Sequence, residues 1–413
     1  MKRKRIGIYK RDMACNGGGD KRSSVMAERL SLLHDVTLVV GGPVSLEKIE
    51  AYFRVDLSRV RVVQLSLPGH DFLRRTLEAP GGSLLRRARV GLFLSKLGRA
   101  AERAYFRQMR QLRFDLLINN QGWSIMKCPA PAGIYMCMFP HDRKGELHGD
   151  HGRGTLYELY ARVGNRIVGM TDEVLDSYDV ITANSAFTAD WIRKLWRRPA
   201  EVVYSACEDM GPAAPKERII VHTGRFVAEE RNDYKHQRTL IETFRGIERL
   251  HKQGWELHLA GTLLPDAGSV RSFGRLEEAA RGLRVYLHPN IGFEELRDIY
   301  RRASIYWHAT GYGQLAAKHP GKQEHFGITT VEGMSAGAVP VVINSGGQRE
   351  SVVHGSCGFL WNDLDELERY TSQLADDPAL LGAVSRSAVE RSTRFSRTAF
   401  ADRVEALVER LLR

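Results

Sequence analysis

Residues 324–342 read Glu324-His-Phe-Gly-Ile-Thr-Thr-Val-Glu332-Gly-Met-Ser-Ala-Gly-Ala-Val-Pro-Val-Val. Two carboxylates stand eight positions apart, a glycine lies between them, and small residues lead into an apolar run. The pattern predicts a helix that starts near Gly327 and a buried strand after it. The first backbone N–H groups of that helix, near Gly327, Ile328 and Thr329, have no partner within the helix. Together with the helix dipole they predict an anion site.

The two carboxylates are placed to bind other parts of a ligand whose anionic group rests on the helix end. A helix rises about 1.5 Å per residue, so Glu332 lies roughly 6 Å from the anion site. That distance suits a carboxylate that accepts hydrogen bonds from two ribose hydroxyls of a nucleoside diphosphate. Glu324 lies in the preceding loop. Acidic pairs at this spacing are common, and the glycine, the helix and the Val-Pro-Val-Val strand make the pattern specific.

Strand-like and helix-like segments alternate along the chain. The predicted strands are residues 5–9, 36–40, 60–64, 115–119, 134–138, 180–183 and 201–204, and then 218–223, 256–260, 285–288, 305–308 and 339–343; the predicted helices include 23–33, 237–251 and 394–413. Between the two groups of strands, Met210-Gly-Pro-Ala-Ala-Pro215 is typical of a linker. This alternation favours an α/β protein of two doubly wound, Rossmann-like domains with parallel sheets. In such sheets ligands bind at the carboxyl ends of the strands.

Several short motifs occur in a fixed order. They are Cys15-Asn-Gly-Gly-Gly-Asp-Lys21, Tyr135-Met-Cys-Met-Phe-Pro140, Asn184-Ser-Ala-Phe-Thr188, Gly224-Arg-Phe226, the 324–342 block and Asn344-Ser-Gly-Gly347. Together they resemble the retaining glycosyltransferases of family 4. The branch they resemble most contains the α-1,2-mannosyltransferase of lipid-linked oligosaccharide assembly and its bacterial relatives. The resemblance implies the GT-B fold, in which two Rossmann-like domains face each other across a cleft.

For this chain the resemblance implies three segments. Residues 1–210 would form an N-terminal acceptor-binding domain, and residues 211–393 a C-terminal nucleotide-sugar-binding domain. A terminal helix, 394–413, would cross back onto the first domain. A chain of 413 residues is too long for a single hydrophobic core, which agrees with two domains.

The diphosphate of a sugar donor becomes a leaving group, so its growing negative charge must be stabilised. Arg225 follows a predicted strand, and Lys235 comes ten residues later. By resemblance these two cations flank the diphosphate, Glu324 serves the sugar ring and Glu332 the ribose. The spacer Glu229-Glu-Arg-Asn-Asp-Tyr234 departs from the family's short one and leaves the position of Lys235 open. The resemblance also implies retention by front-side attack, in which the departing phosphate oxygen helps take the acceptor proton.

Two features concern the first domain. The glycines Gly18 and Gly19 let the backbone approach a ligand closely, and by resemblance their loop faces the donor phosphate and the acceptor. A plain flexible turn is the alternative. His141 could orient the acceptor hydroxyl, although the histidine of close relatives aligns better with Met138.

Histidine occurs in two further settings. His141, Asp142, His148, Asp150 and His151 form the most metal-like cluster of the chain. Their spacing is irregular and glycines interleave them, so we expect an acceptor-side loop and no bound metal. His308 ends a predicted strand, a position typical of a core histidine, and the residues after it could reach the donor sugar.

The chain carries a net charge of +12, and the excess is uneven. Residues 71–113 contain eleven Lys or Arg against three Asp or Glu. A helical projection of 84–113 gathers a basic face of Arg86, Arg89, Lys96, Arg99, Arg103, Arg107 and Arg110. Such a helix beside exposed aromatic residues can rest on an anionic membrane. A helix that packs on the first sheet with a solvated basic face is the alternative.

The sequence also bears on location. No apolar run is long enough to span a bilayer, and the N-terminus is typical of a first strand rather than a signal peptide. Five cysteines without a C-x-x-C pair indicate reduced thiols. We therefore expect a cytoplasmic protein, with the membrane contact on the cytoplasmic face.

The predicted function is a retaining, metal-independent glycosyltransferase. It would move a hexose from a GDP- or UDP-linked sugar, in the first instance mannose from GDP-mannose, onto a glycan or lipid-linked glycan. No cofactor would be permanently bound. A second hypothesis is an enzyme of the same fold that uses a UDP-sugar and a small soluble acceptor. A nucleic-acid-binding protein is the distant third, and no nucleic-acid partner is expected, because no recognised motif accompanies the basic stripe.

Overall fold

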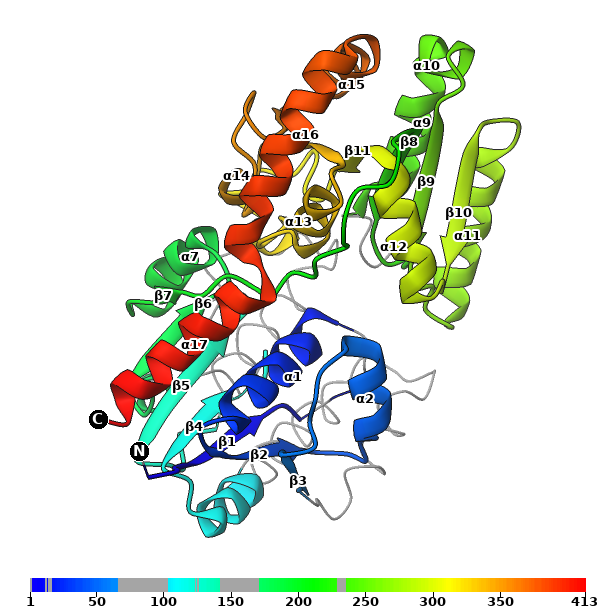
Figure 1. The fold of residues 1–413 in the computed structure, drawn as a ribbon. Coiled ribbons are helices and arrows are strands. Elements are labelled where there is room, and N and C mark those ends of the chain that lie inside the picture. The colour runs from blue at the N-terminus through cyan, green and yellow to red at the C-terminus, as the bar shows by residue number, and fades with distance from the viewer. Residues whose placement is uncertain are drawn as a thin grey trace, which may run out of the picture. The chain divides into compact units, whose positions relative to one another are not determined.

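The computed structural model describes residues 2–11, 13, 17–65, 103–122, 124, 126–141, 171–228 and 235–413. The chain forms two compact units. Unit 1 comprises Met1–Tyr204 together with Phe400–Arg413, and unit 2 comprises Ser205–Ala399. Each unit is built on its own parallel sheet with helices packed against it (Figure 1). The limits predicted for folding domains, 1–210, 211–393 and 394–413, stay a prediction.

Unit 1 contains, within the described residues, a seven-stranded parallel sheet in the order β3-β2-β1-β4-β5-β6-β7. Its strands are β1 (Arg5–Tyr9), β2 (Asp35–Val40), β3 (Arg61–Gln64), β4 (Leu116–Asn119), β5 (Ala132–Cys137), β6 (Val180–Ala183) and β7 (Glu201–Val202). The central strands are buried throughout, as in Leu116–Asn119. Burial on both faces explains why these segments are continuous apolar runs rather than alternating ones.

The described helices of unit 1 include α1 (Gly18–Ser31), α2 (Leu46–Phe53), α6 (Asp172–Leu175) and α7 (Ala186–Trp196), with most of α17 (Arg397–Leu411). Charged pairs join α17 to the rest of this unit. Arg29 of α1 lies 2.8 Å from Asp402 and 2.5 Å from Glu405. Glu201 of β7 contacts Arg403 at 3.1 Å and also Arg410. The C-terminal helix is thus part of unit 1 (Figure 1).

Unit 2 contains a six-stranded parallel sheet in the order β10-β9-β8-β11-β12-β13. The strands are β8 (Glu217–Thr223), β9 (Glu256–Gly261), β10 (Val285–Pro289), β11 (Ala303–His308), β12 (Val339–Ile343) and β13 (Phe359–Trp361). The helices are α9 (Gln237–Gly246), α10 (Glu248–Lys252), α11 (Ala267–Ala280), α12 (Phe293–Arg302), α13 (Ile328–Ser335), α14 (Gln348–Ser351), α15 (Leu364–Asp376) and α16 (Pro378–Ser392).

Two apolar clusters lie on opposite faces of the unit 2 sheet. One contains Ile220, Ile305 and Trp307 and is covered by side chains of α9, α11 and α15. The other contains Ile219, Val221 and Tyr306 and is covered by α12, α13 and α16. Successive strand residues point to opposite faces, so one strand serves both clusters. The predicted doubly wound α/β architecture is confirmed for both units.

Two predicted helices differ from the structure, and one strand was not predicted. Helix α1 begins at Gly18, not at 23, because the glycines themselves form its first turn. The predicted helix 237–251 is interrupted at Ile247, which has φ −90° and ψ 70° and is buried after Gly246. Glycine is a poor helix former, which makes this a favourable place to end α9. Strand β13 was not predicted, since three residues are too few to show a period.

The basic segment 84–113 is only partly described, and residues 84–102 lie outside the described residues. Residues 103–112 are helical, with Arg103, Arg107 and Arg110 exposed. Tyr105 and Met109 are each 1% exposed and join the core of unit 1. Tyr105 therefore packs inward and adds no exposed aromatic ring to the basic face. In the described parts of the chain, every helix is too short or too polar to cross a membrane.

Candidate functional site

The N-terminus of α13 is open in the way that the sequence predicts. Gly327 precedes the helix with φ 97°, a left-handed conformation that favours glycine, and no side chain caps the helix start. A Cβ added at Gly327 would lie 2.8 Å from Oε1 of Gln348, so space as well as conformation requires glycine here. The N–H groups of the first turn, at Ile328 and Thr329, have no intrahelical acceptor. These N–H groups give the helix start a partial positive charge that suits an anion.

The loop before α13 is held by the glycine pair that follows β12. A Cβ at Gly346 would lie 2.1 Å from the carbonyl oxygen of Glu324, and one at Gly347 would lie 2.2 Å from that of His325. The N–H of Gly347 also donates to the Glu324 carbonyl at 2.8 Å. The backbone of the 324–326 loop therefore rests directly on Gly346 and Gly347, which fixes where the Glu324 side chain starts.

The carboxylate of Glu324 is anchored through one oxygen. Its Oε2 lies 3.1 Å from Nζ of Lys235 and 3.2 Å from Nε2 of His308. Burial alone would raise the pKa of Glu324, but the charge of Lys235 and the hydrogen bond from His308 outweigh it and hold this pKa well below 4.5. Glu324 is therefore ionised throughout the physiological range. Its side chain is 20% exposed, so the anchored group still reaches the surface of the site.

His308 was interpreted as a core histidine, and the structure shows that it also belongs to the site. It ends β11 with 0% exposure, beside β12. Burial lowers the pKa of His308 below 6.5, although Glu324 acts to raise it. Its neighbour His222, at the end of β8, lies 5.9 Å away between ring centroids, and burial with the nearby His308 lowers the pKa of His222 to about 3. Both rings are therefore neutral near pH 7.

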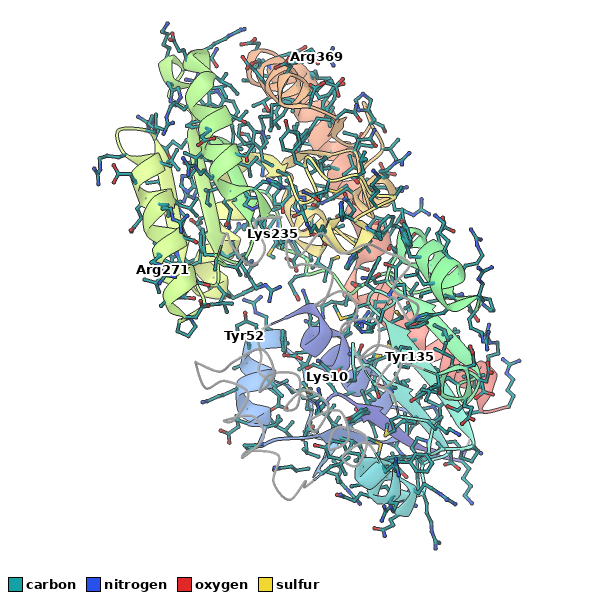
Figure 2. All side chains as sticks on the ribbon, turned by 180° about the vertical axis from the view of Figure 1, so that it is seen from behind. Lys10, Tyr52, Tyr135, Lys235, Arg271 and Arg369 are labelled. Carbon is teal, nitrogen blue, oxygen red and sulfur yellow. The ribbon has the colours of Figure 1, made fainter. Side chains whose placement is uncertain are left out.

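Lys235 and Arg225 come from the segment after β8. Lys235 lies at the end of unit 2 opposite Arg369 of α15 (Figure 2). Arg225 is exposed, and no hydrogen bond or ion pair to its guanidinium occurs among the described residues. A Cβ at Gly261 would lie 2.1 Å from the carbonyl oxygen of Gly224, so the ends of β8 and β9 approach closely just before Arg225. The insert 229–234 lies outside the described residues.

Glu332 lies in the second turn of α13 and is 8% exposed. Its Oε1 accepts a hydrogen bond from the backbone N–H of Glu208 at 3.3 Å. The same helix is tied down by Tyr306, whose hydroxyl lies 2.7 Å from Oγ1 of Thr329. Tyr300 donates to the carbonyl of Thr329 at 3.2 Å. One carboxylate oxygen of Glu332 thus already accepts a hydrogen bond within unit 2.

The remaining predicted residues lie in unit 1. Gly18 and Gly19 form the start of α1, and Asn120 donates to the carbonyl of Gly19 at 2.8 Å. His141 is partly buried, and its carbonyl accepts a hydrogen bond from the indole N–H of Trp196 at 3.0 Å. Burial lowers the pKa of His141, although a hydrogen bond from its ring to the backbone of Gly122 acts to raise it.

The structure thus brings together only part of the predicted set. Glu324 and Lys235 are in contact, and Arg225, Glu332 and the start of α13 belong to the same unit. Among the described residues, no cluster of three or more His, Cys, Asp or Glu side chains could hold a metal ion. The predicted metal-like loop, with Asp142, His148, Asp150 and His151, lies outside them. His308 was missed because an isolated histidine at a strand end carries no spacing signal.

Comparisons with known proteins bear on the family and the fold of this chain. Residues 210–391 match the family "Glycosyl transferases group 1". A GDP-Man:Man(3)GlcNAc(2)-PP-Dol alpha-1,2-mannosyltransferase of Dictyostelium discoideum is 24% identical over 275 residues, which cover 62% of this chain and 50% of that protein. The mouse (Mus musculus) alpha-1,3/1,6-mannosyltransferase ALG2 is 24% identical over 264 residues, covering 59% of this chain and 60% of that protein. The chain therefore spans about half the length of these curated relatives.

Solved structures show the same fold over nearly the full length. The Anabaena protein Alr3699/HepE, solved in complex with UDP-glucose, matches with a TM-score of 0.65 at 14% identity. The match covers 99% of this chain and 100% of that protein. WaaG, a glycosyltransferase involved in lipopolysaccharide biosynthesis, matches with a TM-score of 0.64 at 12% identity. This match covers 97% of this chain and 98% of WaaG. The resemblance to glycosyltransferases of the GT-B fold, predicted from the sequence motifs, is confirmed. The chain therefore contains a glycosyltransferase group 1 domain at residues 210–391, and it has the GT-B fold.

Proposed function

We propose that the protein is a glycosyltransferase that takes a hexosyl group from a nucleoside-diphosphate sugar bound by unit 2. One observation carries the proposal. The ionised carboxylate of Glu324, held by Lys235 and His308, stands in the loop that leads into an uncapped helix N-terminus. An anion site beside a fixed carboxylate and a cation suits a ligand with a diphosphate at one end and hydroxyls at the other.

The diphosphate would lie at the start of α13, with its charge met by the N–H groups of Gly327, Ile328 and Thr329. Arg225 and Lys235 would add two cations. As the bond between the sugar C1 and the phosphate oxygen breaks, negative charge grows on the leaving group. Preorganised dipoles and cations stabilise that charge without reorganisation during the reaction. We propose that they do so without a metal ion.

The carboxylates would hold the two sugars of the donor. Glu332 would accept hydrogen bonds from the ribose hydroxyls, while its contact with the Glu208 N–H fixes the carboxylate. Glu324 would serve the transferred hexose. Because the pKa of Glu324 is held well below 4.5, it suits a permanent hydrogen-bond acceptor better than a proton carrier.

We propose transfer with retention, by attack of the acceptor hydroxyl on the face that the diphosphate leaves. The new bond joins C1 to the acceptor oxygen, and the bond from C1 to the phosphate oxygen breaks. The proton of the acceptor hydroxyl passes to the departing phosphate oxygen. No protein base is needed in this scheme. It agrees with the pKa of Glu324, which is held well below 4.5, so that this carboxylate is a poor proton acceptor near neutral pH.

Mannose from GDP-mannose is the leading donor, because two relatives are named as mannosyltransferases, one of them with GDP-Man. A UDP-sugar is the second candidate, since a structural neighbour holds UDP-glucose. We propose a glycan or lipid-linked glycan as the acceptor, with a small soluble acceptor as the alternative. Unit 1 would serve the acceptor side, with His141, Gly18 and Gly19 as its candidate residues.

A ligand-binding experiment tests the donor assignment. The thermal unfolding of the wild type is measured with GDP and with UDP, and nucleotide at one hundred times its Kd should stabilise by about 2.7 kcal/mol. Glu332→Ala should lose the stabilisation. Glu368→Ala, which removes an exposed carboxylate from α15, is the control and should keep it. A wild type that is stabilised by neither nucleotide would overturn the proposal.

A second experiment concerns the membrane contact proposed for the basic segment. Co-sedimentation with vesicles that contain anionic lipid should fall when exposed Arg103, Arg107 and Arg110 are changed to Glu. Each cation near such a surface contributes about 1 kcal/mol, so losing three should weaken binding at least a hundredfold. Equal binding by the wild type and the triple variant would remove this surface from the proposal.

A further inference from the structure

We propose that His308 is a positioning residue: its imidazole anchors one oxygen of Glu324 so that the other oxygen stays available to the hexosyl group. This inference rests on the proposed function, because it assigns the orientation of the carboxylate that serves the transferred sugar. It adds a residue to the site that no sequence motif points to.

The geometry of the anchor is one-sided. Lys235 and His308 both contact Oε2 of Glu324, at 3.1 and 3.2 Å. Among the described residues, none donates a hydrogen bond to Oε1 of Glu324. A carboxylate with both partners on one oxygen cannot rotate without breaking them, so the second oxygen has a defined direction.

The hydrogen bonds around His308 determine its tautomer. The backbone N–H of Thr310 donates to Nδ1 of His308 at 3.3 Å, so Nδ1 is the acceptor and carries no proton. In the neutral ring the proton then lies on Nε2, where it can be donated to Glu324. The hydroxyl oxygen of Thr310 lies 3.2 Å from the same Nε2, so it also accepts from that N–H. The backbone N–H of Thr310, just after β11, thus keeps the proton on Nε2, so the imidazole can donate from that nitrogen.

A neutral donor suits this position for an electrostatic reason. The diphosphate and Glu324 both need positive charge, and Lys235 already lies against the carboxylate. A second cation on Oε2 would satisfy the carboxylate more fully and weaken its attraction for hydroxyl protons. The buried imidazole instead fixes the orientation of Glu324 without further charge, because burial lowers the pKa of His308.

The strand that carries His308 is well suited to this role. His308 is fully buried and pairs in register with Val342 of β12, in the sheet core. A side chain on a central strand has far less positional freedom than one on a loop. Lys235, by contrast, follows the insert 229–234 and has a long, flexible side chain. Without His308, Glu324 would keep its ion pair with Lys235 and lose the contact that fixes its orientation.

Two substitutions and a matched control test the proposal. His308→Phe keeps an aromatic ring and removes the donor, whereas His308→Gln places an amide N–H near the position of Nε2. His258→Phe is the control. His258 is also buried in the unit 2 sheet, and its Nε2 likewise lies 3.2 Å from a carboxylate, that of Glu256. The control therefore loses the same kind of bond at a distance from the α13 loop.

The assay is hydrolysis of GDP-mannose and of UDP-glucose without acceptor, together with binding of GDP and UDP. His308→Phe should lower kcat about 10- to 100-fold, the range of one hydrogen bond to a charged group. Binding of the nucleotide alone should remain within about twofold, because Glu324 serves the sugar. The kcat of His308→Gln should be at least tenfold higher than that of His308→Phe. The kcat of His258→Phe should match the wild type. The kcat of His308→Phe should also acquire an acid limb, because losing the donor raises the pKa of Glu324.

The outcomes separate the two proposals. A wild type that binds nucleotide and hydrolyses a donor, with His308→Phe unchanged or His308→Gln equally impaired, overturns the positioning role alone. A wild type that binds neither nucleotide overturns the proposed function and this inference with it. Nitrogen-15 spectra of histidine-labelled wild type test the anchor without activity. One imidazole, absent from the spectrum of His308→Gln, should be a neutral Nε2–H tautomer that does not titrate near 6.5. A protonated or Nδ1–H ring at this position would refute the anchor.

Discussion

The strongest structural prediction concerns Gly347, where a single methyl group should move the Glu324 loop. Gly347 has φ −74°, which any residue adopts, so Gly347→Ala introduces no backbone strain of its own. The new Cβ would lie 2.2 Å from the His325 carbonyl oxygen and 2.6 Å from Cα of Phe326. Ordinary contacts begin near 3.4 Å, so the two backbones must separate by more than 1 Å.

The magnitude follows from what that separation breaks. The hydrogen bond from the Gly347 N–H to the Glu324 carbonyl, now 2.8 Å, would be lost at about 1 kcal/mol. Forcing a methyl group into packed backbone adds about 1–3 kcal/mol. Gly347→Ala should therefore destabilise unit 2 by about 2–4 kcal/mol. Because the loop carries Glu324, a displacement near 1 Å should also lower donor hydrolysis about a hundredfold.

The assay pairs denaturant unfolding with donor hydrolysis, and Gly274→Ala is the control. Gly274 lies in α11, is exposed, and has nothing within 4 Å of an added Cβ. Alanine there should stabilise by about 0.5–1 kcal/mol and leave hydrolysis unchanged. If Gly347→Ala proved as stable and as active as Gly274→Ala, the close packing inferred for this loop would be refuted.

Three further predictions concern charged and titrating groups of unit 2. Arg225→Ala, which removes an exposed cation, should lower kcat/KM for the donor about 10- to 100-fold, with no loss of stability in a melting experiment. Lys235→Met should raise the pKa of Glu324. A carboxylate with a depressed pKa stabilises the folded state above pH 4.5, and this stabilisation is lost as the pH falls. The free energy of unfolding of the variant should therefore fall less steeply below pH 4.5 than that of the wild type. The buried His222, whose pKa is lowered to about 3, binds a proton more readily when unfolded, so stability should fall as the pH drops from 6.5 toward 3, by about 4–5 kcal/mol in total. His222→Asn keeps a donor for the Trp307 carbonyl, now bonded to Nδ1 of His222 at 3.0 Å, and should remove most of that fall; an unchanged pH profile would contradict the buried, neutral histidine.

Much of the fold could be predicted because buried parallel strands are continuous apolar segments. Strands β1 and β12 occupy the predicted residues 5–9 and 339–343. The start of α13 was also predictable, since glycine before an apolar, helix-forming segment indicates a left-handed residue at the helix start. These features depend on neighbours in the chain, so a linear pattern contains them.

The contacts of the candidate site depended on tertiary structure. Lys235 and Glu324 are 89 positions apart, and they meet because β8, β11 and β12 are adjacent in the sheet. The role of His308 arises in the same way, from a strand end that the sheet order places beside the Glu324 loop. The inward turn of Tyr105 likewise depends on which helix face the sheet covers. Sequence alone determined the carboxylate spacing and the strand–helix order, because both are local. Only the packing of strands decided which side chains share one carboxylate, because that pairing joins residues with no local relation.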